Sequence, residues 1–180
     1  MTNEDGGFWK HRGFNTEAIG LAIAANLKAG SYRRGAGTIT MQLARNLFLG
    51  HQRTLSRKGQ EVTLAWMLEH LTGIPKQRLL EIYLNIIEWG PDLRGLRPAA
   101  RRYFGREPRA LTPAEMAFLV SIIPAPIKYQ VSFAHGTPGP GLQKLIDDLL
   151  AKLRSVDAIS EEEYRKAEGE TLVVSGMAPG

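Results

Sequence analysis

Acidic and basic side chains are distributed along this 180-residue chain in a way that suits chemistry on an anionic substrate. Glu4 and Asp5 lie near the amino terminus and Glu61 lies further along, but the stretch from Ala18 to Gln60 contains no acidic residue. The basic residues of that stretch are Lys28, Arg33, Arg34, Arg45, Arg53, Arg57 and Lys58. Because a surface normally mixes the two signs, a long segment of one sign predicts a site for an anion. A carboxylate near such a site could supply the base that a reaction there needs.

Composition sets the class of protein in which these residues must work. The net charge of +5 and the isoelectric point near 9.6 indicate an anionic partner: nucleic acid, an acidic lipid surface or a phosphorylated substrate. The hydrophobic fraction of 43% is typical of a globular domain. The absence of cysteine excludes disulfides, thiolate zinc sites and a cysteine nucleophile. No apolar run reaches the roughly 20 residues that span a bilayer, and the amino terminus lacks the apolar region of a signal peptide.

The elements that must position these residues are predicted to be helices. Apolar residues recur at helical spacing, and glycine, proline and capping residues mark the ends of the segments. No alternation of strands and helices is present, so the sequence predicts a mainly α fold. The predicted helices cover residues 15–29, 39–47, 57–71, 76–87, 113–123 and 142–156, with a short last helix after Ser160.

Four local patterns follow one another in a fixed order. They are Glu4-Asp5-x-x-Phe8-x-x-His11-x-Gly13, Gly35-x-Gly37-Thr-Ile-Thr-Met-Gln-Leu43-x-Arg45-Asn46, Arg57-Lys58-x-x-Glu61-x-x-x-Ala65-x-x-Leu68-Glu69 and Leu80-Glu81-x-Tyr83-Leu84-Asn85-x-x-x-x-Gly90. Together they resemble the four motifs of the peptidoglycan glycosyltransferases, the family-51 enzymes that polymerise lipid II. The sequence Glu88-Trp-Gly-Pro91 resembles the monofunctional members more closely than the bifunctional penicillin-binding proteins.

The resemblance implies a role for each residue of these motifs. Glu4 stands at the position of the general base, which takes a proton from the 4-hydroxyl of the acceptor sugar while that hydroxyl displaces the lipid diphosphate of the donor with inversion. Glu61 stands at the position of the second family glutamate, and we expect it to support catalysis. The positions expected to bind substrate are Asp5, Thr38, Gln42, Arg45, Asn46, Arg53, Arg57 and Lys58.

Each of these residues also has an ordinary structural interpretation. Glu4 and Asp5 alone would be a solvated acidic terminus, and the cations alone would be a solvated face. Arg57 and Glu61 share a helix face, a spacing equally typical of a simple helix salt bridge. We expect His11 to be a structural hydrogen-bonding residue and not a metal ligand, since the other histidines, His51, His70 and His135, form no ligand cluster.

Positions outside the expected site carry predictions of their own. We expect Tyr83 to lie in the core and Asn85 to be half-buried. Gly37 replaces the usual serine of the second motif and Met41 its usual first glutamine, and both changes are expected to remove polar side chains from the donor side of the site. The apolar run Leu47–Leu49 between basic residues predicts either contact with a membrane surface or a core cluster.

The fold implied by the resemblance is a lysozyme-like, two-lobed helical domain with a cleft. Residues 1–170 would form the glycosyltransferase domain, with a smaller mobile lobe over residues 30–55, and residues 171–180 a tail. Family members carry a helix and a membrane anchor before the first motif. This chain begins three residues before Glu4, so we expect a domain without those segments.

The same resemblance implies location, partners and cofactors. The domain would act at the outer, periplasmic face of the bacterial cytoplasmic membrane, on lipid II and the nascent glycan strand. A transpeptidase or other cell-wall synthesis proteins are partners that it leaves open. No cofactor is firmly implied, and Mg²⁺ or Mn²⁺ near Glu61 is the one metal ion for which the resemblance leaves room.

Two functions of other kinds fit part of the sequence. A lytic transglycosylase or lysozyme-like hydrolase would use the first glutamate as an acid on a sugar–sugar bond. A neutral glycan, however, does not require four clustered cations. A nucleic-acid-binding module would suit the net charge, but the sequence offers no aromatic stacking platform or recognition motif, so we expect no nucleic-acid partner.

Overall fold

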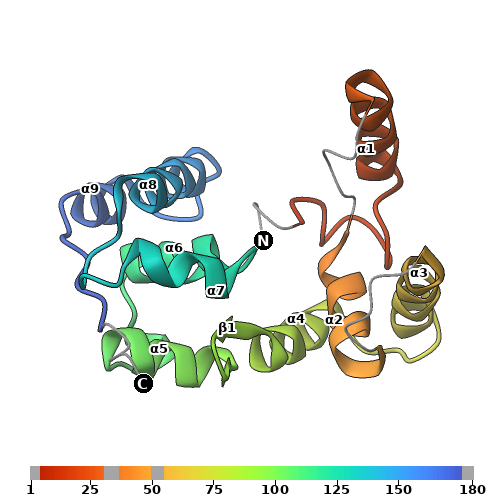
Figure 1. Cartoon of the computed structure of the whole chain (residues 1–180), viewed down its shortest axis with the longest axis horizontal. Coiled ribbons are helices and arrows are strands. Elements are labelled where there is room, and N and C mark those ends of the chain that lie inside the picture. Colours follow the sequence, from red (N-terminus) through yellow and green to blue (C-terminus); the bar gives the residue numbers. More distant parts are fainter. Residues whose placement is uncertain (1–4, 31–36, 50–54, 176–180) are drawn as a thin grey trace. The chain divides into compact units, whose positions relative to one another are not determined.

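Helices make up most of the described structure, which confirms the prediction of a mainly α fold (Figure 1). The computed structural model describes residues 5–30, 37–49 and 55–175. The chain divides into two units, of which unit 1 ends at Ile87 and unit 2 begins at Glu88. No helix among the described residues is both long and apolar enough to cross a membrane.

Unit 1 contains four helices in its described residues. They are α1 (Thr16–Ala29), α2 (Ile39–Phe48), α3 (Leu55–His70) and α4 (Lys76–Ile86). α2 packs on α3 and on α4, and its buried face includes Ile39, Met41 and Leu43. Ala65 of α3 and Leu79 of α4 are buried as well. The amphipathic pattern of α2 therefore places its apolar face inside unit 1 and its later polar residues outside.

The segment before α1 is held against this core by two residues of the first motif. The Phe8 ring is fully buried. Gly13 has φ +87°, and a Cβ there would lie 3.0 Å from the carbonyl oxygen of Ala65. Only glycine combines that backbone conformation with so close an approach to α3. Gly13 thus brings the first motif directly against the α3 backbone.

Unit 2 is built from a short hairpin and a group of helices. The elements are β1 (Glu88–Gly90), β2 (Leu93–Arg94), α5 (Leu96–Phe104), α6 (Pro113–Ile122), α7 (Pro126–Tyr129), α8 (Pro140–Ser155) and α9 (Glu161–Glu168), with 3₁₀ turns at Pro108–Ala110 and Gln130–Ser132. The strands are antiparallel, with Glu88 opposite Arg94 and Gly90 opposite Leu93. α6 packs on α8, and α8 and α9 lie side by side (Figure 1).

Aromatic rings fill the centre of unit 2. Phe118 lies edge-on to Tyr103 and to Phe133, with ring centroids 5.8 and 5.1 Å apart. The Tyr103 hydroxyl donates to the Trp89 carbonyl at 2.7 Å and accepts from the Gln130 amide at 2.8 Å. A Cβ at Gly90 would lie 2.5 Å from that hydroxyl. The glycine of the fourth motif is therefore required by the packing of Tyr103 beneath β1.

The carboxyl-terminal segment packs into unit 2 as far as it is described. Leu172 and Val174 are buried. The Val174 amide donates to the Gly136 carbonyl at 2.8 Å, and the Ser175 amide donates to the Tyr103 carbonyl at 2.9 Å. Residues 171–175, which the sequence assigned to a tail, thus share the hydrogen bonds and the core of unit 2. Residues 176–180 lie outside the described part of the chain.

Most predicted helices are confirmed, with ends that differ by no more than two residues. α5 and the hairpin that precedes it were not predicted as elements. The described part of the expected smaller lobe, residues 37–49, does not stand apart but forms α2 and packs within unit 1. The arrangement of two lobes about a cleft stays a prediction.

Candidate active site

The charges of the two units differ. Of the 23 basic and 18 acidic residues, 11 and 6 lie in unit 1, and 12 and 12 lie in unit 2. The net charge of +5 therefore belongs entirely to unit 1, the unit that carries the first three motifs. A field of this kind favours anionic ligands in unit 1.

Asp5 joins the first motif to the start of α2. Its carboxylate is buried and lies 2.9 Å, through both oxygens, from His11 Nε2. One of these oxygens also accepts a hydrogen bond from the Ile39 amide at 3.1 Å. A carboxylate at a helix amino terminus is favoured by the exposed N–H groups and the dipole there. These contacts favour a positioning role for Asp5, and the structural hydrogen bond expected of His11 is present.

Thr38 is the amino-terminal cap of α2. Its hydroxyl accepts from the Met41 amide at 3.2 Å and donates to the Gly13 carbonyl at 2.6 Å. The side chain is 2% exposed. Both hydrogen-bonding functions of the hydroxyl are therefore used within the protein, so this geometry favours an indirect role for Thr38 in binding substrate.

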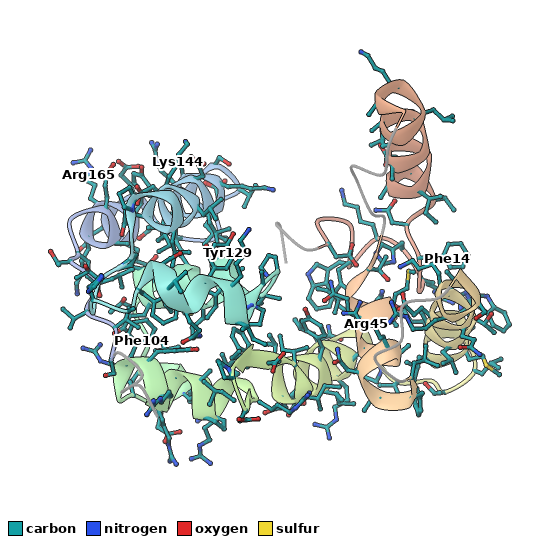
Figure 2. All side chains as sticks on the ribbon, viewed as in Figure 1. Phe14, Arg45, Phe104, Tyr129, Lys144 and Arg165 are labelled. Carbon is teal, nitrogen blue, oxygen red and sulfur yellow. The ribbon has the colours of Figure 1, made fainter. Side chains whose placement is uncertain are left out.

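The polar residues further along α2 are more accessible. The Tyr83 hydroxyl of α4 donates to Gln42 Oε1 at 3.1 Å and thereby orients the half-buried amide. Arg45 is half-buried in the last turn of α2, where a cation is favoured by the helix dipole (Figure 2). Asn46 is exposed, and its amide nitrogen donates to the Gln42 carbonyl at 2.9 Å. Gln42, Arg45 and Asn46 are thus presented in succession along one helix.

Glu61 is the centre of a second charged group, on α3. It is 2% exposed, and its Oε2 accepts from Lys58 Nζ at 2.9 Å. Its Oε1 lies 3.3 Å from Arg57 Nε. Both cations stand in the first turn of α3, which contains no acidic residue. The positive dipole end of a 16-residue helix adds to these two cations, a combination that suits a phosphate or diphosphate.

Gly37 links the two groups in space. A Cβ built at Gly37 would lie 3.8 Å from Lys58 Nζ. The residue before the α2 cap therefore adjoins the cations at the start of α3. The expected sites for the donor, in the second and third motifs, are in this way brought together within unit 1.

The surroundings of Glu61 do not fit a divalent metal ion in the described residues. Mg²⁺ and Mn²⁺ prefer several oxygen ligands. No group of three or more His, Cys, Asp or Glu side chains that could hold a metal ion occurs in residues 5–30, 37–49 and 55–175. Both Glu61 oxygens face cationic side chains instead. The expected metal ion near Glu61 stays a prediction.

Two predicted residues lie outside the described part of the chain. These are Glu4, the expected base, and Arg53, an expected diphosphate ligand. Asp5, the neighbour of Glu4, is described, and its contacts place the first motif against the amino terminus of α2. Of the remaining basic residues in the acid-free stretch, Arg33 and Arg34 also lie outside the described residues.

Three expectations about neighbouring positions are settled by burial. Tyr83 is 1% exposed, so its place in the core is confirmed. Asn85 is exposed and donates to the Glu81 carbonyl at 2.8 Å, so the expectation of a half-buried residue is wrong. The Met41 side chain is 2% exposed, because it faces the core of unit 1. The methionine therefore does not remove a polar group from an exposed wall of the site.

The apolar end of α2 is at the surface. Leu47 is 43% exposed and Phe48 is 58% exposed, which excludes the core cluster for these two side chains. Two exposed apolar residues next to Arg45 retain the interfacial pattern noted in the sequence.

Sequence reasoning missed the partners that hold these residues. It did not anticipate that Tyr83 orients Gln42, or that Thr40 donates to Glu69 of α3. Both contacts join residues far apart in the chain. The only signal for them was that Glu69 and Tyr83 belong to the third and fourth patterns.

Comparison with known proteins agrees with this geometry. Residues 1–139 match the protein family described as Transglycosylase. A biosynthetic peptidoglycan transglycosylase of Acinetobacter baylyi is 45% identical over 127 residues, which are 71% of this chain and 56% of that protein. One from Azoarcus sp. is 41% identical over 150 residues, 83% of this chain and 62% of that protein. The chain belongs to the transglycosylase family.

Family membership confirms the resemblance of the four motifs and the prediction of an enzyme. The transglycosylase chain spans a little over half the length of these two relatives. A crystal structure of penicillin-binding protein 1A from Haemophilus influenzae is also similar, with 30% sequence identity and a TM-score of 0.49 over 59% of this chain and 15% of that one.

Proposed function

We propose that this transglycosylase chain polymerises lipid II into glycan strands. The observation that carries the proposal is the grouping, within unit 1, of the first-motif segment, the start of α2 and the cationic first turn of α3. A site for a diphosphate leaving group requires positive charge where negative charge develops. The names of the relatives, which are biosynthetic enzymes, support synthesis over cleavage of glycan.

In the proposed reaction Glu4 accepts the proton of the acceptor 4-hydroxyl. The oxygen attacks the anomeric carbon of the donor, a new glycosidic bond forms, and the bond from that carbon to the diphosphate oxygen breaks. The electron pair leaves with the lipid diphosphate. Arg45, Arg57 and Lys58 are the described cations proposed to stabilise it, with Arg53 as a further ligand, while Glu61 holds Arg57 and Lys58 in place.

The proposed substrate also determines where the protein works. Lipid II is embedded in a membrane, so the chain would act at the outer face of the bacterial cytoplasmic membrane. Leu47 and Phe48, exposed at the end of α2, are proposed to contact the bilayer there. The nascent glycan strand is the second substrate, and a transpeptidase that cross-links it is a proposed partner.

Polymerisation of purified lipid II by the chain in detergent or vesicles tests the proposal. Wild type should form glycan polymer, and Glu4→Gln should lower the rate by about 10²–10⁴-fold, because the base is lost. Glu17→Gln is a matched control, since Glu17 is an exposed acid in the first turn of α1. That control should retain the wild-type rate.

Other outcomes would overturn the proposal. Cleavage of finished glycan without polymer formation would favour the lytic alternative. Binding of DNA with a steep salt dependence, and no reaction with lipid II, would favour the nucleic-acid alternative. Equal rates for wild type and Glu4→Gln would remove Glu4 from the role of base.

A further inference from the structure

A partly buried ion pair outside the proposed reaction site joins α3 to α4. Lys76 Nζ lies 2.7 Å from the Glu69 carboxylate. The Glu69 side chain is 3% exposed and that of Lys76 is 18% exposed. The Glu69 carboxylate is largely removed from water, so taking away its cationic partner alone would be costly.

Each partner of this pair is at an unfavourable helix end. Glu69 is the second-to-last residue of α3, where the dipole disfavours an anion, and Lys76 is the first residue of α4, where it disfavours a cation. Helix stability alone would therefore place the two charges the other way round. Residues that go against the charge preference of a helix end are often found at functional positions.

The pair also contacts two of the segments that build the candidate site, the start of α2 and the first motif. The Thr40 hydroxyl, in the first turn of α2, donates to Glu69 Oε1. Lys76 Nζ lies 4.2 Å from the centre of the buried Phe8 ring, in the first motif, as a cation–π contact. Phe8 in turn lies edge-on to His11, the partner of Asp5.

These contacts complete a set of three hydrogen bonds at the α2 cap and the two residues that follow it. Thr38 is bonded to the Gly13 carbonyl, the Ile39 amide to Asp5, and Thr40 to Glu69. The first two bonds come from the first motif and the third from α3. The start of α2 is thus hydrogen-bonded both to the first motif and to α3.

We propose that Lys76 and Glu69 are positioning residues of the transglycosylase reaction. The pair sets the place of the Phe8 segment, which carries Glu4, relative to α2, which carries Gln42 and Arg45. It acts through Thr40 and Phe8 and has no contact with substrate. This inference rests on the proposed function, because the reaction that needs the alignment is polymerisation of lipid II.

The alternative is that the pair only fastens the turn between α3 and α4. Lys76→Met keeps the length of the side chain and removes its charge, and Glu69→Gln keeps an acceptor for Thr40. Each single variant leaves one charge without its partner, so both should lower the melting temperature, Lys76→Met more than Glu69→Gln because the Glu69 side chain is the more buried of the two. The double variant Lys76→Met/Glu69→Gln leaves no unpaired charge and should recover most of the wild-type melting temperature.

The rate of the double variant decides between the two roles. If the pair positions the site, kcat for lipid II should stay about 10- to 100-fold below wild type with KM within about threefold, because the cation over Phe8 is absent. Lys76→Arg retains that cation and should restore kcat to within a few-fold of wild type. Arg78→Met is the matched control on α4, since the Arg78 side chain is 58% exposed, and it should leave kcat unchanged.

A second measurement does not depend on lipid II activity. Amide hydrogen exchange of Ile39 and Phe8, which are bonded to Asp5, should be faster in the folded double variant than in wild type. The Val174 amide of unit 2 serves as the internal reference and should not change. If the double variant has wild-type kcat and a wild-type rate of exchange at Ile39, the positioning role is wrong, and the pair only stabilises the turn between α3 and α4. If wild type does not polymerise lipid II, the exchange result still decides the positioning, and only the proposed function falls.

Discussion

Gly37 lies next to the cationic group of unit 1, so the absence of a side chain at this position affects what Lys58 can contact. The φ of Gly37 is outside the left-handed region, and among the described residues an added Cβ meets only Lys58 Nζ, at the ordinary contact distance of 3.8 Å. A serine there fits without strain and brings a hydroxyl near the ammonium group. The glycine is therefore a chemical difference from the usual motif and not a steric necessity.

Gly37→Ser should consequently strengthen substrate binding. We expect KM for lipid II to fall about 2- to 10-fold, the worth of one additional hydrogen bond. Gly37→Ala is the control, because it adds the same Cβ without the hydroxyl and should leave KM unchanged. Both variants should raise the free energy of unfolding by roughly 0.4–1 kcal/mol through the loss of unfolded-state freedom. Equal KM values for the serine and alanine variants would show that the hydroxyl makes no contact of consequence.

At the scale of the element, α2 depends on its cap. Thr38→Val removes both hydrogen bonds of the Thr38 hydroxyl and leaves the shape of the side chain nearly unchanged. We expect the free energy of unfolding to fall by about 1–2 kcal/mol, as measured by urea denaturation. Thr38→Ser retains the hydroxyl and should cost less than half as much. If Thr38→Val weakened substrate binding, measured through KM, by more free energy than it removed from the stability of the fold, Thr38 would bind substrate directly, as the motif resemblance implied.

The helices that could be predicted from the sequence are those with a clear stripe and a clear end. Thr112-Pro-Ala-Glu115 forms the predicted capping box at the start of α6, and Ser160 with Glu163 forms another at α9. α5 escaped prediction because Gly95 offers no side-chain cap and Pro98 lies within its first turn. Its short polar sequence also lacks a long apolar stripe.

The contacts that position the candidate site could not be predicted in the same way. The motif residues were identified from their order in the sequence, but their partners are set by packing. The bond from Asp5 to Ile39 and the bond from Tyr83 to Gln42 each close a long stretch of chain. Hydrophobic periodicity reports which face of a helix is buried, and carries no information on which polar groups then meet. Asn85 shows the limit, since its place in a motif suggested burial and the structure exposes it.

On the scale of the whole molecule, the two units have different electrostatic characters. The net positive charge resides in unit 1, while unit 2 is neutral and pairs many of its charges at the surface. Hydrogen bonds from Arg97 and Arg101 hold the pKa of Glu107 below its ordinary value. A hydrogen bond from Arg165 is the main cause of the lowered pKa of Glu161. Unit 2 thus holds many of its charges in local pairs, and unit 1 retains an excess of positive charge that suits the proposed anionic substrate.

Ionisation of Tyr103 should lower the stability of unit 2 at alkaline pH. Burial raises the pKa of its phenol, although the hydrogen bond from Gln130 and the charge of Arg102 oppose this. An unfolded tyrosine ionises near pH 10, so the folded state has the higher pKa. The stability contributed by the neutral phenol is therefore complete below about pH 10 and is lost as the pH rises through the raised pKa.

Tyr103→Phe separates this titration from the packing of the ring. We expect the variant to lose about 1–2 kcal/mol at neutral pH, because the hydroxyl no longer bonds to Trp89 and Gln130, and to show a shallower loss of stability above pH 10. Fluorescence of the buried Trp89 in a Trp9→Phe/Trp66→Phe background reports unfolding of unit 2, since the two replaced tryptophans belong to unit 1. Tyr129→Phe, at a half-buried tyrosine of α7 in the same unit, is the control and should follow wild type at every pH. If the free energy of unfolding fell as steeply above pH 10 in Tyr103→Phe as in wild type, the loss of stability would belong to another group.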